Sequence, residues 1–195
     1  MLDSWTALPD TALAAVGSLH EPFARAGCAT FRAAARHVHG IPYGRNSDRS
    51  DWRLVLEEAR GTCSTKHALL AALAREQRVP VALVIGIFDM SEANTPGVGG
   101  VLSAHALASL PEAHCYLTWQ GRRVDVTRAG PVPEVPISRF HAEWEIDPSQ
   151  IGEHKVRLHQ RYLAQWLTRH PEMSLSLDGL WRIREECIAA LAAQR

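Results

Sequence analysis

The chain has 195 residues, of which 46% are hydrophobic, so it can bury one sizeable core and is short for two separate domains. Its 21 Lys and Arg residues equal its 21 Asp and Glu residues, so no overall field favours a nucleic acid or an anionic membrane as partner. The first residues lack the basic and apolar regions of a secretory signal, and no apolar stretch approaches the roughly 18 residues of a membrane span. We therefore expect a cytoplasmic protein whose four widely separated cysteines are free thiols.

The first part of the chain is predicted to be helical. Residues 10–39 are rich in alanine, and apolar side chains recur at helical spacing before Gly40 and Pro42 stop the helix. The recurring positions are Phe31, Ala34, Ala35 and Val38. A polar loop over 45–51 and a short apolar turn over 52–58 then lead to the next helix.

The middle of the chain is predicted to contain a buried helix and a buried strand. Residues from Cys63 to about Gln77 are good helix formers with apolar positions around most of the circumference. Residues 79–88 are β-branched and aliphatic, which favours a strand. The glycine-rich segment 89–110 is expected to form a loop at the rim of a site. Its Gly97-Val98-Gly99-Gly100 run is not a phosphate-binding loop, because no Gly-Lys-Ser/Thr follows.

The last third is predicted to contain a β-hairpin and two helices. Residues 114–119 and 122–127 are extended segments around the turn signal Gln120-Gly121, and a proline-rich stretch over 131–136 then leads away from the sheet. Asp147-Pro148-Ser149-Gln150 is a good helix start, so a long helix should run to about residue 170. A second helix should follow, with one apolar face made by Leu180, Ile183, Cys187 and Leu191.

The position of Cys63 marks it as a candidate nucleophile. It stands two residues after Gly61, at the start of the predicted buried helix. The thiolate is the reactive form of cysteine, and the free N–H groups and partial positive charge of a helix N-terminus lower the pKa of a thiol.

The predicted hairpin brings a histidine and an aspartate together. With a two-residue turn, Trp119 faces Arg122, and side-chain alternation then places His114 and Asp125 on one face, together with Tyr116 and Thr127. His114 and Asp125 become diagonal neighbours about 7 Å apart between backbones, within reach of each other's side chains. The same alternation turns Cys115 to the opposite face, where we expect it to pack in the core.

Together these residues resemble the transglutaminase-like superfamily of papain-type thiol enzymes, in which a Gly-x-Cys begins a buried helix and His and Asp follow on neighbouring strands. The resemblance covers roughly residues 30–127 and includes Ile41-Pro42-Tyr43, Val55-Leu56 and Val79-Pro80-Val81-Ala82. The chain departs from the family pattern at Arg78, where members usually carry glycine, and at Tyr116, where they usually carry tryptophan.

The resemblance implies a papain-like α+β fold. A buried helix carrying Cys63 would pack on a small antiparallel sheet carrying His114 and Asp125. Cys63 would be the nucleophile, His114 the base and Asp125 the orienting acid. The catalytic domain would span 1–147, with a C-terminal helical hairpin over 148–195 packed on it. Nothing about that hairpin is carried over from the family.

Such a triad performs acyl transfer through a cysteine thioester, which is released to water or to an amine. The Cys63 backbone N–H is the natural first oxyanion donor, and Asn46 or Tyr43 on the upstream segment is a candidate for the second. A small chain with zero net charge has little surface for gripping two protein substrates. We therefore expect hydrolysis of an amide or peptide bond in a small-molecule or peptide substrate, without a cofactor.

Two other functions remain open. Cys63, His67 and His114 with one more ligand would suit a tetrahedral zinc site, but no CxxC or HxxxH pair pre-organises one, so we expect no metal. A catalytically silent protein would keep the fold as a binding scaffold.

Several polar residues also have purely structural interpretations. His67 is expected to be a polar neighbour of Cys63, and Asp125 can cap a strand end beside Thr127. His37 and His39 suit the negative end of a helix dipole. Lys155 and His159 share a helix face that is expected to be solvated.

Overall fold

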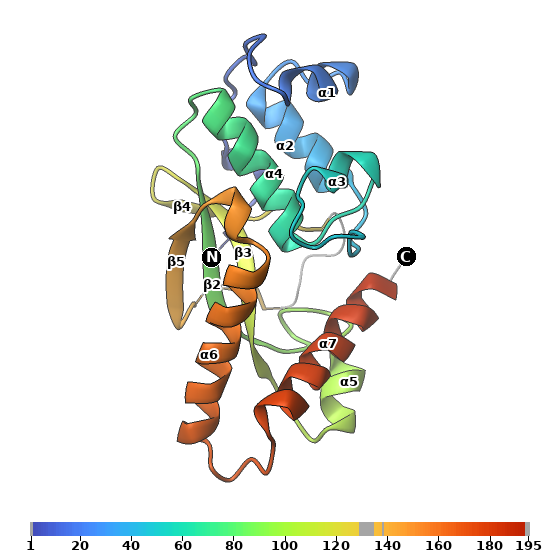
Figure 1. The fold of residues 1–195 in the computed structure, drawn as a ribbon, viewed down its shortest axis with the longest axis vertical. Helices are drawn as coiled ribbons and strands as arrows, with labels where there is room; N and C mark the ends of the chain where they lie inside the picture. Colours follow the sequence, from blue (N-terminus) through green and yellow to red (C-terminus); the bar gives the residue numbers. More distant parts are fainter. Residues whose placement is uncertain (1, 129–134, 138, 194–195) are drawn as a thin grey trace.

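The computed structural model describes residues 2–128, 135–137 and 139–193, and these residues form an α+β structure (Figure 1). The helices are α1 (His20–Arg25), α2 (Phe31–Gly40), α3 (Leu54–Glu57), α4 (Cys63–Glu76), α5 (Gly99–Ala104), α6 (Glu153–Arg169) and α7 (Leu177–Ala193). The strands are β1 (Leu2–Asp3), β2 (Ala82–Met90), β3 (Leu110–Trp119), β4 (Arg122–Val124) and β5 (Ala142–Ile146). Two short 3₁₀ helices, η1 (Trp5–Ala7) and η2 (Pro148–Gln150), complete the described elements.

The strands form one sheet in the order β1-β4-β3-β2-β5. Neighbours from β4 to β5 are antiparallel, and the two-residue β1 joins β4 in parallel. The predicted hairpin register is confirmed, because Trp119 pairs with Arg122 across a turn in which Gln120 and Gly121 both have positive φ. Strand β4 ends at Val124, so it pairs only with the end of β3, from Leu117 to Trp119.

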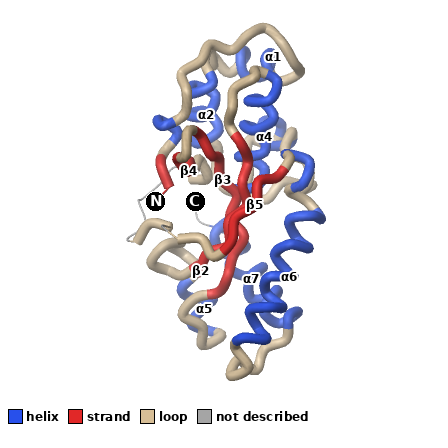
Figure 2. The backbone as a smooth tube through the Cα atoms, turned by 90° about the vertical axis from the view of Figure 1, so that its left-hand side faces the viewer, coloured by secondary structure: helices blue, strands red, loops and turns tan. Residues whose placement is uncertain are grey.

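The described residues form two hydrophobic cores, and helix α4 lies at the centre of the larger one, called the first core below. It is buried along most of its length and packs between α2 and the strands β2 and β3 (Figures 1 and 2). This confirms the predicted core helix over 63–77 and the apolar face of α2, whose Phe31, Ala34, Ala35 and Val38 are all buried. After α4, Arg78 adopts φ +55°, a left-handed conformation that usually favours glycine, the residue that the family resemblance leads one to expect there.

A second core lies at the other end of the sheet, where α5, α6 and α7 gather in the lower half of Figure 1. Phe88 and Met90 at the end of β2 and Leu110 at the start of β3 pack with apolar residues of these helices. The predicted inner face of the last helix is confirmed, since Leu180, Ile183, Cys187 and Leu191 are buried. The C-terminal helices therefore share a core with β2 and β3.

The prediction of helix throughout 10–39 is wrong for its first third. Residues 10–19 contain no helix, and the Glu76 carboxylate accepts the backbone N–H groups of Ser18 and Leu19 at 3.0 and 2.9 Å. The remainder divides into α1 and α2 at Gly27, where φ is +74°. Long-range side-chain contacts to the end of α4 thus override the helix propensity of the alanines.

The expectation that segment 89–110 is a rim loop is also wrong, because the segment contains α5 and packs against α7 in the second core. The Glu92 carboxylate accepts the backbone N–H groups of Gly97 and Gly99 within this segment. Strand β5 was not predicted. Most of the proline-rich stretch 131–136 lies outside the described residues.

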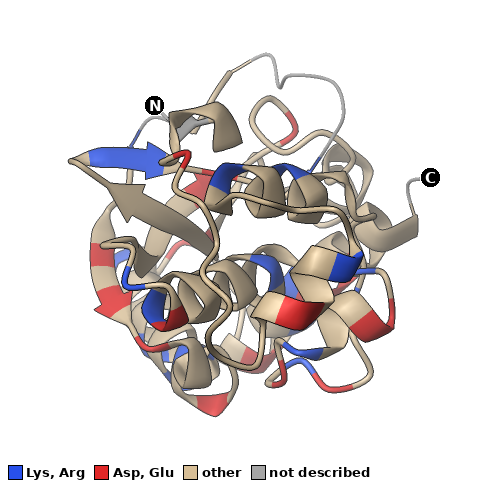
Figure 3. Ribbon diagram, turned by 90° about the horizontal axis from the view of Figure 1, so that it is seen from above, with Lys and Arg blue, Asp and Glu red and all other residues tan. Residues whose placement is uncertain are grey.

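None of the described helices is long and apolar enough to cross a membrane. Acidic and basic residues are interspersed over the molecule in the view of Figure 3, in agreement with the zero net charge.

Candidate functional site

Cys63 is the first residue of α4, and local packing fixes the start of this helix there. The Thr62 N–H donates to Thr65 Oγ1 at 3.0 Å, half of a capping box at the N-terminus. A Cβ on Gly61 would lie 2.9 Å from Lys66 Cγ and 3.1 Å from Val55 Cγ2, so only glycine fits without displacing them. Cys63 is half-buried, whereas the other three cysteines are fully buried.

His114 and Asp125 form the predicted pair. His114 Nε2 lies 2.9 Å from Asp125 Oδ2, so Nδ1 is the ring nitrogen that is available to the Cys63 sulfur. Asp125 also accepts the Thr127 backbone N–H and hydroxyl on its other oxygen, at 2.8 and 2.5 Å. The aspartate thus fulfils both interpretations given for it, as a cap of its own backbone and as the partner of the imidazole.

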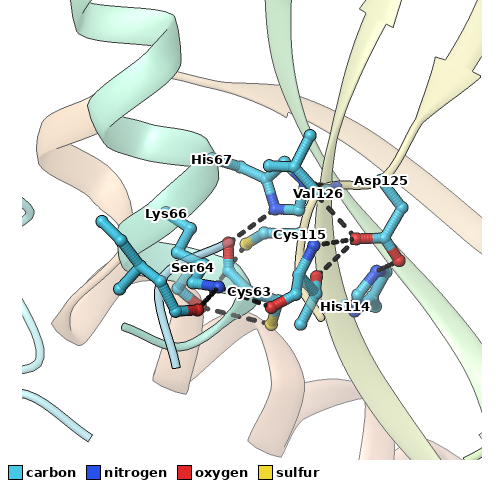
Figure 4. A network of polar contacts seen from close by, with 10 residues as sticks. Cys63, Ser64, Lys66, His67, His114, Cys115, Asp125 and Val126 are labelled. Atoms are coloured by element: carbon cyan, nitrogen blue, oxygen red, sulfur yellow. Dashed lines mark hydrogen bonds and ion pairs between the residues drawn. The ribbon is translucent and has the colours of Figure 1, made fainter. Parts of the chain in front are cut away.

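Two side chains of α4 hold the Asp125 segment in place beyond the end of β4 (Figure 4). His67 Nδ1 lies 2.7 Å from the Cys63 carbonyl oxygen, and its Nε2 accepts the Val126 N–H at 2.8 Å. Lys66 Nζ donates to the carbonyl oxygens of Ile41 and, at 2.8 Å, Thr127. Because β3 does not pair with residues 125–127, the helix carrying the cysteine takes over the role of a neighbouring strand.

The site favours a thiolate beside an imidazolium. A hydrogen bond from Cys115 lowers the pKa of Cys63 well below its usual value, against burial, and the positive charges of Lys155 and His114 act in the same direction. Burial alone would lower the pKa of His114, but the charge and hydrogen bond of Asp125 raise it to about 10. Burial would raise the pKa of Asp125, but the charge and hydrogen bond of His114 hold it well below its usual range.

Cys115 belongs to this cluster, which corrects its exclusion on the basis of strand alternation. Its Sγ lies 3.6 Å from Ser64 Oγ, and Cys63 Sγ lies 3.9 Å from the same oxygen. The alternation itself is correct, but the first turn of α4 contacts side chains from both faces of β3. Its hydrogen bond to Cys63 and its burial raise the pKa of Cys115, so Cys115 is the protonated partner of the two.

The two candidate oxyanion donors differ in their surroundings. Tyr43 lines the cavity beside Cys63, and backbone hydrogen bonds tie its segment to Gly61. Burial and the Cys63 charge raise the pKa of Tyr43, so its phenol stays protonated as a donor. The Asn46 amide instead donates to Glu58 Oε2 at 3.1 Å and to the Arg60 carbonyl at 2.9 Å. Asn46 therefore holds the loop, and its donors do not serve the cavity.

The C-terminal helices form one wall of that cavity, which measures about 70 Å³. Lys155 and His159 of α6 line it and are 7% and 1% exposed, so the expected solvated face is wrong. Lys155 Nζ donates to Ser64 Oγ at 2.7 Å, and His159 Nε2 lies 2.9 Å from the Pro111 carbonyl oxygen. No residue of the fully described segment 89–110 lines the cavity, so the predicted rim loop does not cover it.

A buried ion pair completes the wall. Glu112 of β3 accepts two hydrogen bonds from Arg184 of α7, at 2.6 and 2.8 Å. The spacing of charges in the sequence did not indicate these contacts, because Arg184 lies 72 residues from Glu112 and Lys155 lies 91 residues from Ser64.

The zinc interpretation finds no support in the positions of its ligands. Both His67 nitrogens are engaged by backbone groups, and His114 Nε2 is held by Asp125. Within the described part of the chain, no group of three or more His, Cys, Asp or Glu side chains is arranged to hold a metal ion.

Comparison with family models, curated proteins and solved structures gives no match to this chain. The function is therefore inferred from the geometry of the site.

Proposed function

We propose that the protein is a thiol-dependent acyl-transfer enzyme of transglutaminase-like type, with Cys63, His114 and Asp125 as its catalytic residues. The observation that carries this proposal is the 2.9 Å hydrogen bond between His114 and Asp125 beside Cys63, which is the first residue of a buried helix. A helix bearing the cysteine against a strand bearing His114, with Asp125 directly after the neighbouring strand, is close to the arrangement expected of papain-like folds, which supports the proposal.

In the first half of the reaction the Cys63 thiolate attacks the substrate carbonyl carbon, and the C=O π electrons move to oxygen. The Cys63 backbone N–H and the Tyr43 hydroxyl stabilise the resulting oxyanion. When the oxyanion collapses, the C–N or C–O bond breaks and the leaving group takes a proton from His114 Nδ1. A Cys63 thioester and a neutral imidazole remain.

In the second half His114 accepts a proton from water while the oxygen attacks the thioester, and the Cys63 thiolate leaves. An amine in place of water would give acyl transfer. The cavity of about 70 Å³ has room for a few water molecules, which supports a small acyl group rather than a second protein as the occupant. Hydrolysis of an amide or peptide bond is therefore the proposed reaction.

Selective labelling tests the nucleophile. Limiting iodoacetamide near pH 6 should alkylate Cys63, because Cys63 alone has a lowered pKa. Burial raises the pKa of Cys28, and of Cys187 to about 11, so these two thiols are internal controls in the same digest. Mass spectrometry that finds the label first on Cys28, Cys115 or Cys187 would remove Cys63 as the nucleophile.

Turnover tests the reaction. Activated acyl esters and a glutamine-containing peptide library, each with and without a primary amine, should give a thioester on wild-type protein and none on Cys63→Ala. Release of acid should exceed amine incorporation at millimolar amine. Faster incorporation would replace hydrolysis by transfer, and equal rates for wild type and Cys63→Ala would favour a silent scaffold.

A further inference from the structure

The cavity beside Cys63 has more positive than negative side chains in its lining. Arg45, Arg49, Lys155 and Arg184 contribute positive charge, and Glu112 is the carboxylate among the lining residues. Two of these cations are already neutralised: Arg184 pairs with Glu112 and Glu185, and Arg45 pairs with Glu185 at 2.6 Å. The excess positive charge therefore belongs to Lys155 and Arg49.

Lys155 is a buried ammonium without a direct ion-pair partner among the described residues, although the negative charges of Cys63 and Glu112 act on it. Its residue is 7% exposed, and its Nζ donates one hydrogen bond, to the neutral Ser64 hydroxyl. Among the described residues, no carboxylate lies within ion-pair distance of this nitrogen. A buried charge is costly unless it is paired, and an ammonium has three donors, so two of them remain for an anion in the cavity.

Arg49 is exposed at the entrance, and tight packing brings its loop there. A Cβ on Gly152 would lie 2.6 Å from the Ser50 Cβ, so the glycine before α6 lets the loop over 45–51 lie directly against that helix. The two cations thus come from different segments, one from the upstream loop and one from α6.

We propose that this cavity binds the carboxylate of an anionic acyl substrate, with Lys155 as the specificity-determining residue and Arg49 at the entrance. This inference rests on the proposed function of Cys63. The substrate class is a small acyl donor that carries a carboxylate a few bonds from the reacting carbonyl. Ser64 lies between the Lys155 ammonium and the Cys63 sulfur, so a carboxylate at Lys155 is close to the nucleophile.

A pair of alkylating reagents tests charge recognition without requiring turnover. Iodoacetate and iodoacetamide differ by one negative charge and little in size, and both react with the same thiolate. The ratio of their rates at Cys63 therefore cancels any change in thiol pKa. Relative to a neutral blocked cysteine, wild-type protein should favour iodoacetate by about tenfold, the effect expected of one nearby charge.

Lys155→Met should lose most of this preference, and Lys155→Arg should keep it, which also shows that the site tolerates substitution. Arg157→Met is the matched control, because it removes an equal charge from the exposed side of the same helix. A wild-type ratio equal to that of the blocked cysteine, or an unchanged ratio in Lys155→Met, would overturn the inference.

Turnover separates this inference from the proposed function. Two thioester donors of equal length, one ending in a carboxylate and one in a carboxamide, should differ about tenfold in kcat/KM with wild type and little with Lys155→Met. Equal turnover of both donors would refute the charge preference while the function stands. An alkylation preference without turnover of either donor would support anion binding and refute the function.

Discussion

Among the described residues, two carboxylate–imidazole pairs of equal length each have one member on a strand of the sheet, and one of the two adjoins the Cys63 thiol. His114 Nε2 lies 2.9 Å from Asp125, and His141 Nε2 lies 2.9 Å from Asp89. Burial separates them, because the side chain of Asp125 is 23% exposed and that of Asp89 is 51% exposed. The chemistry at the residue scale therefore depends on what surrounds the pair.

Replacing Asp125 tests its role as the orienting acid. Asp125→Asn should lower the pKa of His114 from about 10 toward its usual value, because the largest favourable charge is lost. Activity that requires the imidazolium is lost as pH rises through the His114 pKa, so the alkaline limit of the rate profile should move down. The maximal rate should fall about 10²–10⁴-fold, the usual contribution of acid–base catalysis.

Asp89→Asn is the matched control, since it breaks the same kind of pair away from the thiol. It should leave both the rate and the pH profile unchanged. An Asp125→Asn protein with a wild-type alkaline limit would show that the His114–Asp125 pair is structural only.

Among the elements, the first turns of α4 direct four side chains to different partners. Cys63 and Ser64 face the cavity, while Lys66 and His67 hold the backbone of residues 126–127. His67 does this as a neutral ring, because burial lowers its pKa to about 4. The helix start is therefore both the nucleophile site and the clamp that positions Asp125.

Acid should weaken this clamp. The folded-state pKa of His67 is below the unfolded value of 6.5, so its contribution to stability is fully present above pH 6.5 and is lost as pH falls toward 4. The shift corresponds to about 3 kcal/mol at most. Denaturant unfolding of wild type between pH 7 and pH 5 should show this decline, in a range where Asp125 stays ionised in both states.

His67→Gln keeps a donor and an acceptor at this position without the titration. It should be less stable at pH 7, and its unfolding free energy should depend less on pH than that of wild type. The remaining slope should combine His159 and His39, whose pKa values burial also lowers, with His114, whose raised pKa acts in the opposite direction in this range. Equal slopes for the two proteins would contradict the neutral clamp.

At the scale of the whole molecule, the C-terminal helices are part of the site and of the second core. Helix α6 supplies Lys155 and His159 to the cavity, and α7 supplies Arg184. The second core joins the ends of β2 and β3 to both helices. The boundary expected near residue 147 therefore crosses a shared core and a shared cavity.

Removing 148–195 should prevent formation of the site. The truncated chain would expose the apolar residues Phe88, Met90, Val98, Leu102, Leu107 and Leu110. At about 1.5–3 kcal/mol for each large buried side chain, this loss is comparable to the whole stability of a typical domain. Residues 1–147 should therefore lack a cooperative unfolding transition and selective labelling of Cys63.

If the helices act by packing, adding the separate 148–195 segment should partly restore cooperative unfolding and selective labelling of Cys63. A truncated chain that unfolds cooperatively and still labels selectively at Cys63 would instead show that the first 147 residues are an independent catalytic unit.

The sequence alone determined the features that depend on local periodicity and turn chemistry. The start of α4 at Cys63, the Gln120-Gly121 turn and the pairing of Trp119 with Arg122 follow from helix-forming residues and strand alternation. These features identified Cys63, His114 and Asp125 as candidates. The reactivity of a thiol depends on its position in a helix, and the contact between two side chains of a hairpin depends on the strand register.

The distant groups that complete the site come together only through the packing of whole elements. Cys115 contacts Ser64 although alternation turns it away from His114, and Lys155 is buried although its helix face is polar in sequence. Asn46 is engaged by Glu58 and Arg60, which leaves Tyr43 at the cavity. These outcomes depend on how whole elements pack against the first turn of α4, and no local pattern encodes a contact between residues dozens of positions apart.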